Sequence, residues 1–297
     1  MATFKHISSK NADYGAAEQY LTFEHDEFTM KPTLDKNGRL LPRDDYRISS
    51  LNCGGEDFAI ACMRSNLKYG KNQKREDVKS HHYIISFDPR DAPDNGLTVD
   101  RAQQLGEQFC KEHFPGHQAL VCTHPDGHNH SGNIHVHIVI NSLRIAEVPL
   151  LPYMERPADT REGCKHRCTD AAMEYFKAEV MEMCHRENLY QIDLLNGSKN
   201  RITEREYWAK RKGQAALDKE NASQAATGEP PKQTKFETDK EKLRKTIRKA
   251  LAAAATFDDF SSLLLREGVT VKESRGRLSY LTPDRTKPIT ARKLGDD

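Results

Sequence analysis

The chain has 297 residues, 36% of them hydrophobic and 30% charged, with a formal net charge of +2, a composition typical of a water-soluble globular protein. It contains neither a run of roughly 18 apolar residues, which a membrane helix needs, nor the apolar stretch of a secretion signal, so we expect a cytoplasmic protein without membrane insertion. Its seven cysteines are scattered and form no CxxC pair, which argues against a disulfide framework or a four-cysteine zinc site.

Helical and strand patterns alternate along the first two thirds of the chain. In chain order, they predict a helix from about Asn11 or Asp13 through Leu21, a loop over 31–55, a short helix over 56–69, a strand over 81–87, an amphipathic helix over 98–113, strands over 119–124 and 134–141, and a long helix over 168–189. A polar segment joins the last two strands, which predicts an antiparallel hairpin. The pattern as a whole predicts an α+β fold in which helices flank a central antiparallel β-sheet.

The composition changes after about residue 197. Residues 197–250 hold 15 Lys and Arg against 8 Asp and Glu, and their pattern predicts a helix, an exposed linker and a second helix. A further helix, ended by Gly268, and two short strands over 269–273 and 278–281 predict a small C-terminal α/β unit. We therefore expect three parts: a main domain over 1–197, a basic helical segment and linker over 198–240, and a small domain over 241–297.

The strongest chemical signal is a group of histidines in the predicted hairpin. His135 and His137 alternate along one strand, which places both imidazoles on the same face. His124 on the preceding strand would complete a three-histidine site for a divalent metal with open positions for substrate oxygens. Because neutral imidazoles leave the charge of the metal available, such a site can polarise a phosphodiester. An apolar strand would otherwise hold Val or Ile at these positions, so we prefer a metal site to a histidine-rich loop without function.

Four other polar residues belong to this segment. Asp126 could orient a ligand imidazole through its second nitrogen. His128 is an alternative metal ligand. Otherwise, His128 and His130 each contact a ligand imidazole, contact DNA or are merely exposed. Asn141 ends the second strand and either caps it or holds the site.

The segment His-Pro-Asp-Gly at 124–127, followed by Ile-His-Val-His-Ile-Val-Ile-Asn-Ser at 134–142, resembles the metal motif of conjugative relaxases, the mobilisation nucleases. The run at 82–87 and the pair Asn52-Cys53 match two further motifs of that family, in the order of the family, and the likeness is to MobP-type enzymes of Gram-positive mobile elements. The spacer before His135 is longer than is usual in the family. We retain His124 as the first ligand because His-x-Asp accompanies it.

The resemblance implies an HUH endonuclease-like sandwich and a tyrosine nucleophile near the N-terminus. Tyr20 fits the family pattern, and Tyr14 is its competitor. A phenol is a good nucleophile once deprotonated and a good leaving group, so a phosphotyrosine link can be resealed. His82 is a candidate to assist Tyr20 or to bind the scissile phosphate, and Asp126 joins these two as the third catalytic candidate.

The function that the resemblance implies is strand-specific nicking at a transfer origin, with Mg or Mn as the ion and a covalent 5′-phosphotyrosine intermediate. The implied partners are single-stranded and hairpin DNA at that origin, accessory relaxosome proteins and a type IV secretion coupling protein, which leads the bacterial protein with its DNA into the recipient cell. Two other functions share the metal architecture: an HUH-type replication initiator, and a non-catalytic DNA-binding module whose histidines hold a structural metal.

Basic residues with an interleaved Trp follow the main domain and could bind single-stranded DNA through phosphate contacts and base stacking: Lys199, Arg201, Arg205, Trp208, Lys210 and Arg211. A charged connecting helix whose Trp packs onto the domain would have the same composition. The segment 276–295 resembles one that follows the nuclease domain in relaxases, and we expect the natural chain to continue beyond residue 297.

Overall fold

The computed structural model describes residues 2–26, 28–125, 127, 132–196, 202–226 and 233–295. The chain divides into two compact units, Met1–Asn196 and Gly197–Asp297. The boundaries expected at residues 197 and 240 stay a prediction. Within the described ranges, no helix combines the length and the apolar character needed to cross a membrane.

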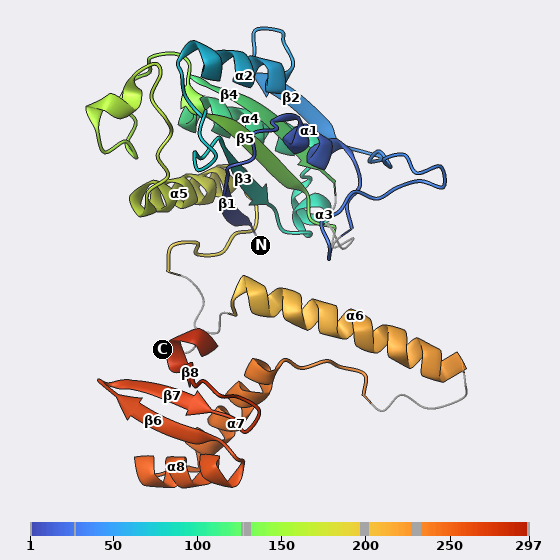
Figure 1. Ribbon diagram of the computed structural model, residues 1–297, viewed down its shortest axis with the longest axis vertical. Helices are drawn as coiled ribbons and strands as arrows, with labels where there is room; N and C mark the ends of the chain where they lie inside the picture. The colour runs from blue at the N-terminus through green and yellow to red at the C-terminus, as the bar shows by residue number, and fades with distance from the viewer. Residues whose placement is uncertain are drawn as a thin grey trace. The chain divides into compact units, whose positions relative to one another are not determined.

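A five-stranded antiparallel sheet forms the centre of the first unit (Figure 1). Its strands are β1 (Thr3–Ser9), β2 (Arg47–Leu51), β3 (Ser80–Ser86), β4 (His117–His124) and β5 (His135–Arg144). Their order across the sheet is β1-β3-β5-β4-β2. The α+β fold with a central antiparallel sheet flanked by helices is confirmed, and β4 and β5 form the predicted antiparallel pair.

Helices cover both faces of this sheet. They are α1 (Gly15–Thr22), α2 (Phe58–Lys68), α3 (Asp91–Asn95), α4 (Val99–His113) and α5 (Asp170–Arg186), with a 3-10 turn over Pro157–Thr160. Val136 and Ile138 of β5 share a buried core with α4 and α5, whereas Val139 packs with Leu21 of α1 and Phe58 of α2. Because side chains alternate along a strand, His135 and His137 face the α1 and α2 side.

A glycine brings α4 close to the sheet. A Cβ atom on Gly106 would lie 2.3 Å from Cγ1 of Val136 and 3.2 Å from Cγ1 of Val121. Only a residue without a side chain fits at this distance, so Gly106 allows the helix to pack directly on β4 and β5.

The two edge strands were not predicted. Strand β2 lies in the segment 31–55, where the sequence predicts a loop, so that prediction is wrong over Arg47–Leu51. Among the strands of the described residues, β1 pairs only with β3, and β2 pairs only with β4. Neither strand contains a fully buried residue. Edge strands of this kind do not need the apolar run that marks β3, β4 and β5, so the sequence pattern does not reveal them.

The second unit is built of three helices and a small sheet. Its elements are α6 (Glu204–Ala226), α7 (Asp239–Ala253), α8 (Phe257–Arg266), β6 (Thr270–Ser274), β7 (Arg277–Leu281), β8 (Ile289–Thr290) and a 3-10 turn over Ala291–Leu294. The strands are antiparallel in the order β6-β7-β8. Leu243, Phe260, Leu264 and Tyr280 share its buried core. The predicted small C-terminal α/β unit is confirmed, with β8 as an additional strand.

Candidate metal centre

The three predicted metal ligands meet on one face of the sheet. His124 at the end of β4 lies directly opposite His135 at the start of β5, and His137 follows on the same face. The ring centroids are 4.8 to 5.0 Å apart, and Nδ1 of His124 lies 3.2 Å from Nε2 of His135. One ligand nitrogen from each ring lies within 4.8 Å of the others, and all three side chains are buried. This donor set can hold a divalent metal ion.

Each of these rings is oriented by a hydrogen bond at its other nitrogen. Nε2 of His124 donates to the main-chain oxygen of Leu21 at 2.8 Å, and Nδ1 of His135 lies 3.2 Å from the oxygen of Asn133. A carbonyl oxygen only accepts, so in a neutral imidazole each of these bonds places the proton on this nitrogen and leaves the second nitrogen as the one that could bind a metal. The sequence gives no sign of either contact, because the acceptors are main-chain atoms.

His82 performs the same task for the third ligand. Its Nε2 lies 2.8 Å from Nδ1 of His137, and the two ring centroids are 4.9 Å apart. Burial lowers the pKa of His82 to about 4, so this imidazole is neutral near pH 7. The remaining nitrogens for a metal are then Nδ1 of His124 and Nε2 of His135 and His137.

Tyr20 lies beside this centre. It belongs to α1, and its ring centroid is 6.0 Å from that of His137 and 6.2 Å from that of His82. The ring of His25, which the sequence analysis did not single out, lies 5.1 Å from it. Burial raises the pKa of Tyr20, and the positive charge of Arg43 partly opposes this rise.

Tyr14 has a different environment. Its hydroxyl donates to the main-chain oxygen of Lys79 at 3.0 Å and accepts from Nδ2 of Asn66 at 2.7 Å. Burial raises its pKa strongly. The side chain of Asn141 belongs to the same buried network and bonds Gln118 at 3.0 Å. This network joins α1, α2 and the sheet, and it is a structural feature rather than a reactive one.

Several predicted site residues have no described position. Asp126, His128, His130, Lys199 and Arg201 lie outside the described residues, so their expected roles stay predictions.

The other basic candidates lie on α6. Arg205 is exposed and Trp208 is half-buried. The guanidinium of Arg211 lies 5.9 Å from the centre of the Trp208 ring, and Nζ of Lys210 pairs with Glu241 at 3.0 Å.

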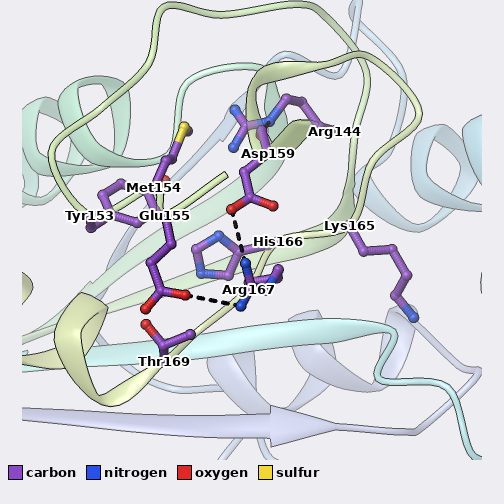
Figure 2. Close-up of a pocket in the computed structure, with 9 residues that line it drawn as sticks. All are labelled: Arg144, Tyr153, Met154, Glu155, Asp159, Lys165, His166, Arg167 and Thr169. Atoms are coloured by element: carbon purple, nitrogen blue, oxygen red, sulfur yellow. Dashed lines mark hydrogen bonds and ion pairs between the residues drawn. The ribbon is translucent and has the colours of Figure 1, made fainter. Parts of the chain in front are cut away.

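A small polar pocket lies on the opposite side of the sheet (Figure 2). His166, which lines it, bonds the hydroxyl of Tyr83 at 2.7 Å. Arg167 pairs with Glu155 at 3.0 Å and with Asp159 at 3.2 Å, as the dashed lines mark. The enclosed volume is about 10 Å³, which admits no more than one water molecule. Because the guanidinium of Arg167 is already paired with two carboxylates of the wall, its charge is not directed to a ligand.

Part of the chain matches a known family model. Residues 42–148, which include His82 and all three metal-site histidines, match the family model described as relaxase, MobA/VirD2-like, nuclease domain. Two curated relatives, both called Protein rlx from Staphylococcus aureus, are 25% identical over 251 residues and 22% identical over 249 residues. Each alignment covers 84% of this chain, and the chain spans 60% and 62% of the lengths of these relatives.

The chain also has a weak similarity to solved structures. One, from work on the molecular basis of vancomycin resistance transfer in Staphylococcus aureus, is 14% identical with a TM-score of 0.38 and covers 63% of this chain and 92% of its own. The conjugative relaxase TrwC in complex with oriT DNA, in its metal-bound form, is 12% identical with a TM-score of 0.33 and covers 89% of this chain and 96% of its own. Over residues 42–148 the chain is therefore similar to the MobA/VirD2-like nuclease domain of relaxases, and over most of its length it is similar to the two relatives called Protein rlx.

Proposed function

We propose that this chain nicks one DNA strand at the transfer origin of a conjugative element, with Tyr20 as the nucleophile. The observation that carries the proposal is the approach of the Tyr20 ring to within 6.0 Å of the His137 ring, which brings a phenol to the edge of a three-histidine site. Tyr14, the competing nucleophile, is engaged in a buried network with Lys79, Asn66 and Asn141, and within the described residues it bonds none of the three histidines.

The reaction is a transesterification. The phenol oxygen of Tyr20 forms a bond to the scissile phosphorus while the bond from phosphorus to the 3′ oxygen breaks. The phenol loses its proton, the 3′ oxygen takes one up, and the products are a 5′-phosphotyrosine link and a free 3′-hydroxyl. Attack of a 3′-hydroxyl on this link reverses the reaction and reseals the strand.

The histidines hold the ion and keep it in place. His124, His135 and His137 would bind a divalent metal, for which we propose Mg or Mn, and the bound ion would supply positive charge for the phosphate oxygens. His82 fixes the orientation of His137, and its neutral ring carries no positive charge for a phosphate near pH 7, so we assign it a positioning role. Asp126, the third catalytic candidate, and His128, the alternative ligand, keep the roles that the sequence predicts.

The DNA partner and the wider assembly follow from the family. We propose single-stranded and hairpin DNA at the transfer origin as the substrate, with Arg205, Trp208, Lys210 and Arg211 of α6 and the preceding Lys199 and Arg201 as further DNA contacts. Accessory relaxosome proteins and a type IV secretion coupling protein complete the proposed partners. The protein would act in the bacterial cytoplasm and pass with the DNA into the recipient.

A cleavage assay tests this function. Labelled oligonucleotides that tile both strands of the element's transfer origin are incubated with the chain and Mg²⁺ or Mn²⁺, and the products are separated on a denaturing gel. We expect one oligonucleotide to form a covalent adduct that is lost in Tyr20→Phe and in His135→Ala but retained in Tyr14→Phe.

The other outcomes are equally informative. An adduct that survives Tyr20→Phe removes Tyr20 as the nucleophile. Tight binding without an adduct in the whole set identifies a non-catalytic DNA-binding module, and an adduct formed only with replication-origin DNA identifies a replication initiator.

A further inference from the structure

His25 lies at the base of the arm that follows α1. This arm is the extended segment between α1 and β2, drawn in blue (Figure 1). The main chain on either side of His25 is fixed by hydrogen bonds across the arm. The amide of Glu24 donates to the oxygen of Leu41 at 2.8 Å, and the amide of Asp26 donates to the oxygen of Lys31 at 2.8 Å. These bonds determine where the arm presents the imidazole of His25.

One nitrogen of the His25 ring is committed and the other is not. Nδ1 lies 3.0 Å from the main-chain oxygen of Phe23. A carbonyl oxygen only accepts, so the neutral ring carries its proton on Nδ1 and keeps a lone pair on Nε2. Within the described part of the chain, Nε2 has no hydrogen-bond partner, and the side chain is half-buried. An imidazole that is oriented through one nitrogen and has a lone pair on the other is built like a general base.

The ring of His25 contacts that of Tyr20. Their centroids are 5.1 Å apart and their planes are inclined by 55°, whereas the rings of His82 and His137 lie 6.2 and 6.0 Å from Tyr20. With Nε2 of His137 reserved for a metal, the proton of that ring is on Nδ1, which donates to Nε2 of His82 at 2.8 Å. The neutral ring of His82 then carries its own proton on Nδ1. Of these three rings, only that of His25 offers a nitrogen that can take up a proton.

We propose that His25 is the general base of this site, whose Nε2 takes the phenol proton of Tyr20 as the phenol oxygen attacks the scissile phosphorus. The inference rests on the proposed function and adds a catalytic residue to it. The proton passes to the lone pair of Nε2, and the ring becomes an imidazolium whose Nδ1 still donates to the oxygen of Phe23. When the strand is resealed, the imidazolium returns the proton to the phenol oxygen. Catalytic hydrogen bonds are often long in unliganded sites and tighten when substrate binds, so a ring contact is the geometry expected before DNA is bound.

His25→Asn isolates this role. The side-chain amide of asparagine can replace Nδ1 as the donor to the oxygen of Phe23, but it has no nitrogen that accepts a proton. The variant therefore keeps the bond that holds the side chain and loses the base. His185→Gln, at an exposed position of α5, is the matched control, because it removes an imidazole that is not part of the metal centre.

The first experiment measures the reactivity of the Tyr20 phenol without DNA. The Mg²⁺-loaded chain is treated with N-acetylimidazole at neutral pH. The phenol oxygen forms an acetyl ester, the reagent leaves as imidazole, and a neighbouring base accelerates the step by taking the phenol proton. Peptide mass spectrometry follows the acetylation of Tyr20, with Tyr207 on α6, which is 42% exposed, as the internal reference. We expect His25→Asn to slow the acetylation of Tyr20 about tenfold or more and to leave that of Tyr207 unchanged.

The control and the opposite outcomes are well defined. In His185→Gln both tyrosines should react as in the parent. The base role is overturned if Tyr20 reacts equally fast in the parent and in His25→Asn, or if it stays unmodified in the parent while Tyr207 reacts. If His25→Asn does not fold, His25→Gln is judged by the same criterion.

A second experiment separates this inference from the proposed function. Adduct formation is measured under single-turnover conditions with the oligonucleotide that reacts with the parent. At saturating DNA, His25→Asn should lower the rate about 100-fold or more, while the DNA affinity, measured in the Tyr20→Phe background, stays unchanged. A weaker affinity with an unchanged rate would make His25 a DNA contact and overturn the base role. If no oligonucleotide forms an adduct, the nicking proposal fails, while the acetylation result still decides whether His25 takes the proton of Tyr20.

Discussion

The main-chain oxygen of Leu21 accepts a hydrogen bond from Nε2 of His124 at 2.8 Å. Leu21 follows Tyr20 in α1, and His124 ends β4. The helix that carries the proposed nucleophile is therefore joined to one of the three metal-site imidazoles. His124 thus helps to position the phenol of Tyr20 and is also one of the residues that would bind the metal.

This contact predicts different effects for two ligand substitutions. His124→Ala and His135→Ala should both abolish high-affinity metal binding, because each removes one of three ligands. Without metal, only His124→Ala should also increase amide hydrogen exchange in α1, because it alone removes the bond to Leu21. Titration calorimetry and hydrogen-exchange mass spectrometry measure the two effects. Equal exchange of α1 in both variants would show that the bond does not hold the helix.

Substitutions of the two adjacent histidines of β3, His81 and His82, should differ in their effect on metal affinity. His82 contacts His137 at 2.8 Å, whereas His81 faces the other side of the sheet, where its Nδ1 lies 2.9 Å from Nε2 of His6. We expect His82→Ala to weaken metal affinity about 10- to 100-fold, since it frees a ligand ring to rotate. His81→Ala should leave the affinity unchanged. Competition with a chelator measures both, and a similar loss in the two variants would refute the positioning role.

Substitution of Tyr14 should lower the stability of the protein, whereas substitution of Tyr20 should abolish its activity. Tyr14→Phe removes a hydroxyl that satisfies Asn66 and the oxygen of Lys79, so urea unfolding should show a loss of about 1–3 kcal/mol. Adduct formation should persist in this variant under conditions where it remains folded. Tyr20→Phe should abolish the adduct. An adduct lost in folded Tyr14→Phe would reverse the assignment of the nucleophile.

Acid should destabilise the first unit through its buried histidines. Burial lowers the pKa of His81 and of His117 to about 3 from an ordinary value near 6.5. Between these values the unfolded chain binds more protons than the folded one, so the free energy of unfolding should fall as the pH is lowered from about 6.5 toward 3. Urea midpoints at a series of pH values measure this.

A matched pair of variants identifies the source of this pH dependence. His117→Gln should reduce the slope of stability against pH, because one buried group no longer titrates. His185→Gln, at an exposed position of α5, should leave the slope unchanged. An unchanged slope in His117→Gln would assign the effect to other groups.

The sequence alone was sufficient to predict the β4–β5 hairpin and the position of its three histidines on one face. Side chains alternate along a strand, so the spacing of His135 and His137 places them on one face wherever the strand lies, and the polar turn brings His124 opposite. The apolar runs of β3, β4 and β5 likewise mark the central strands of the sheet. These features depend on neighbours in the chain, and local spacing is enough to predict them.

Tertiary structure alone decided the surroundings of that site. The bond from His124 to Leu21 joins positions that are 103 residues apart, and its acceptor is a main-chain oxygen that any residue would provide. The resemblance to relaxases favours Tyr20 over Tyr14, but only the structure shows that Tyr14 is engaged with Asn66 and that Tyr20 lies beside His137. Such contacts arise when distant segments pack together, and the amino-acid pattern around each residue carries no record of its partner.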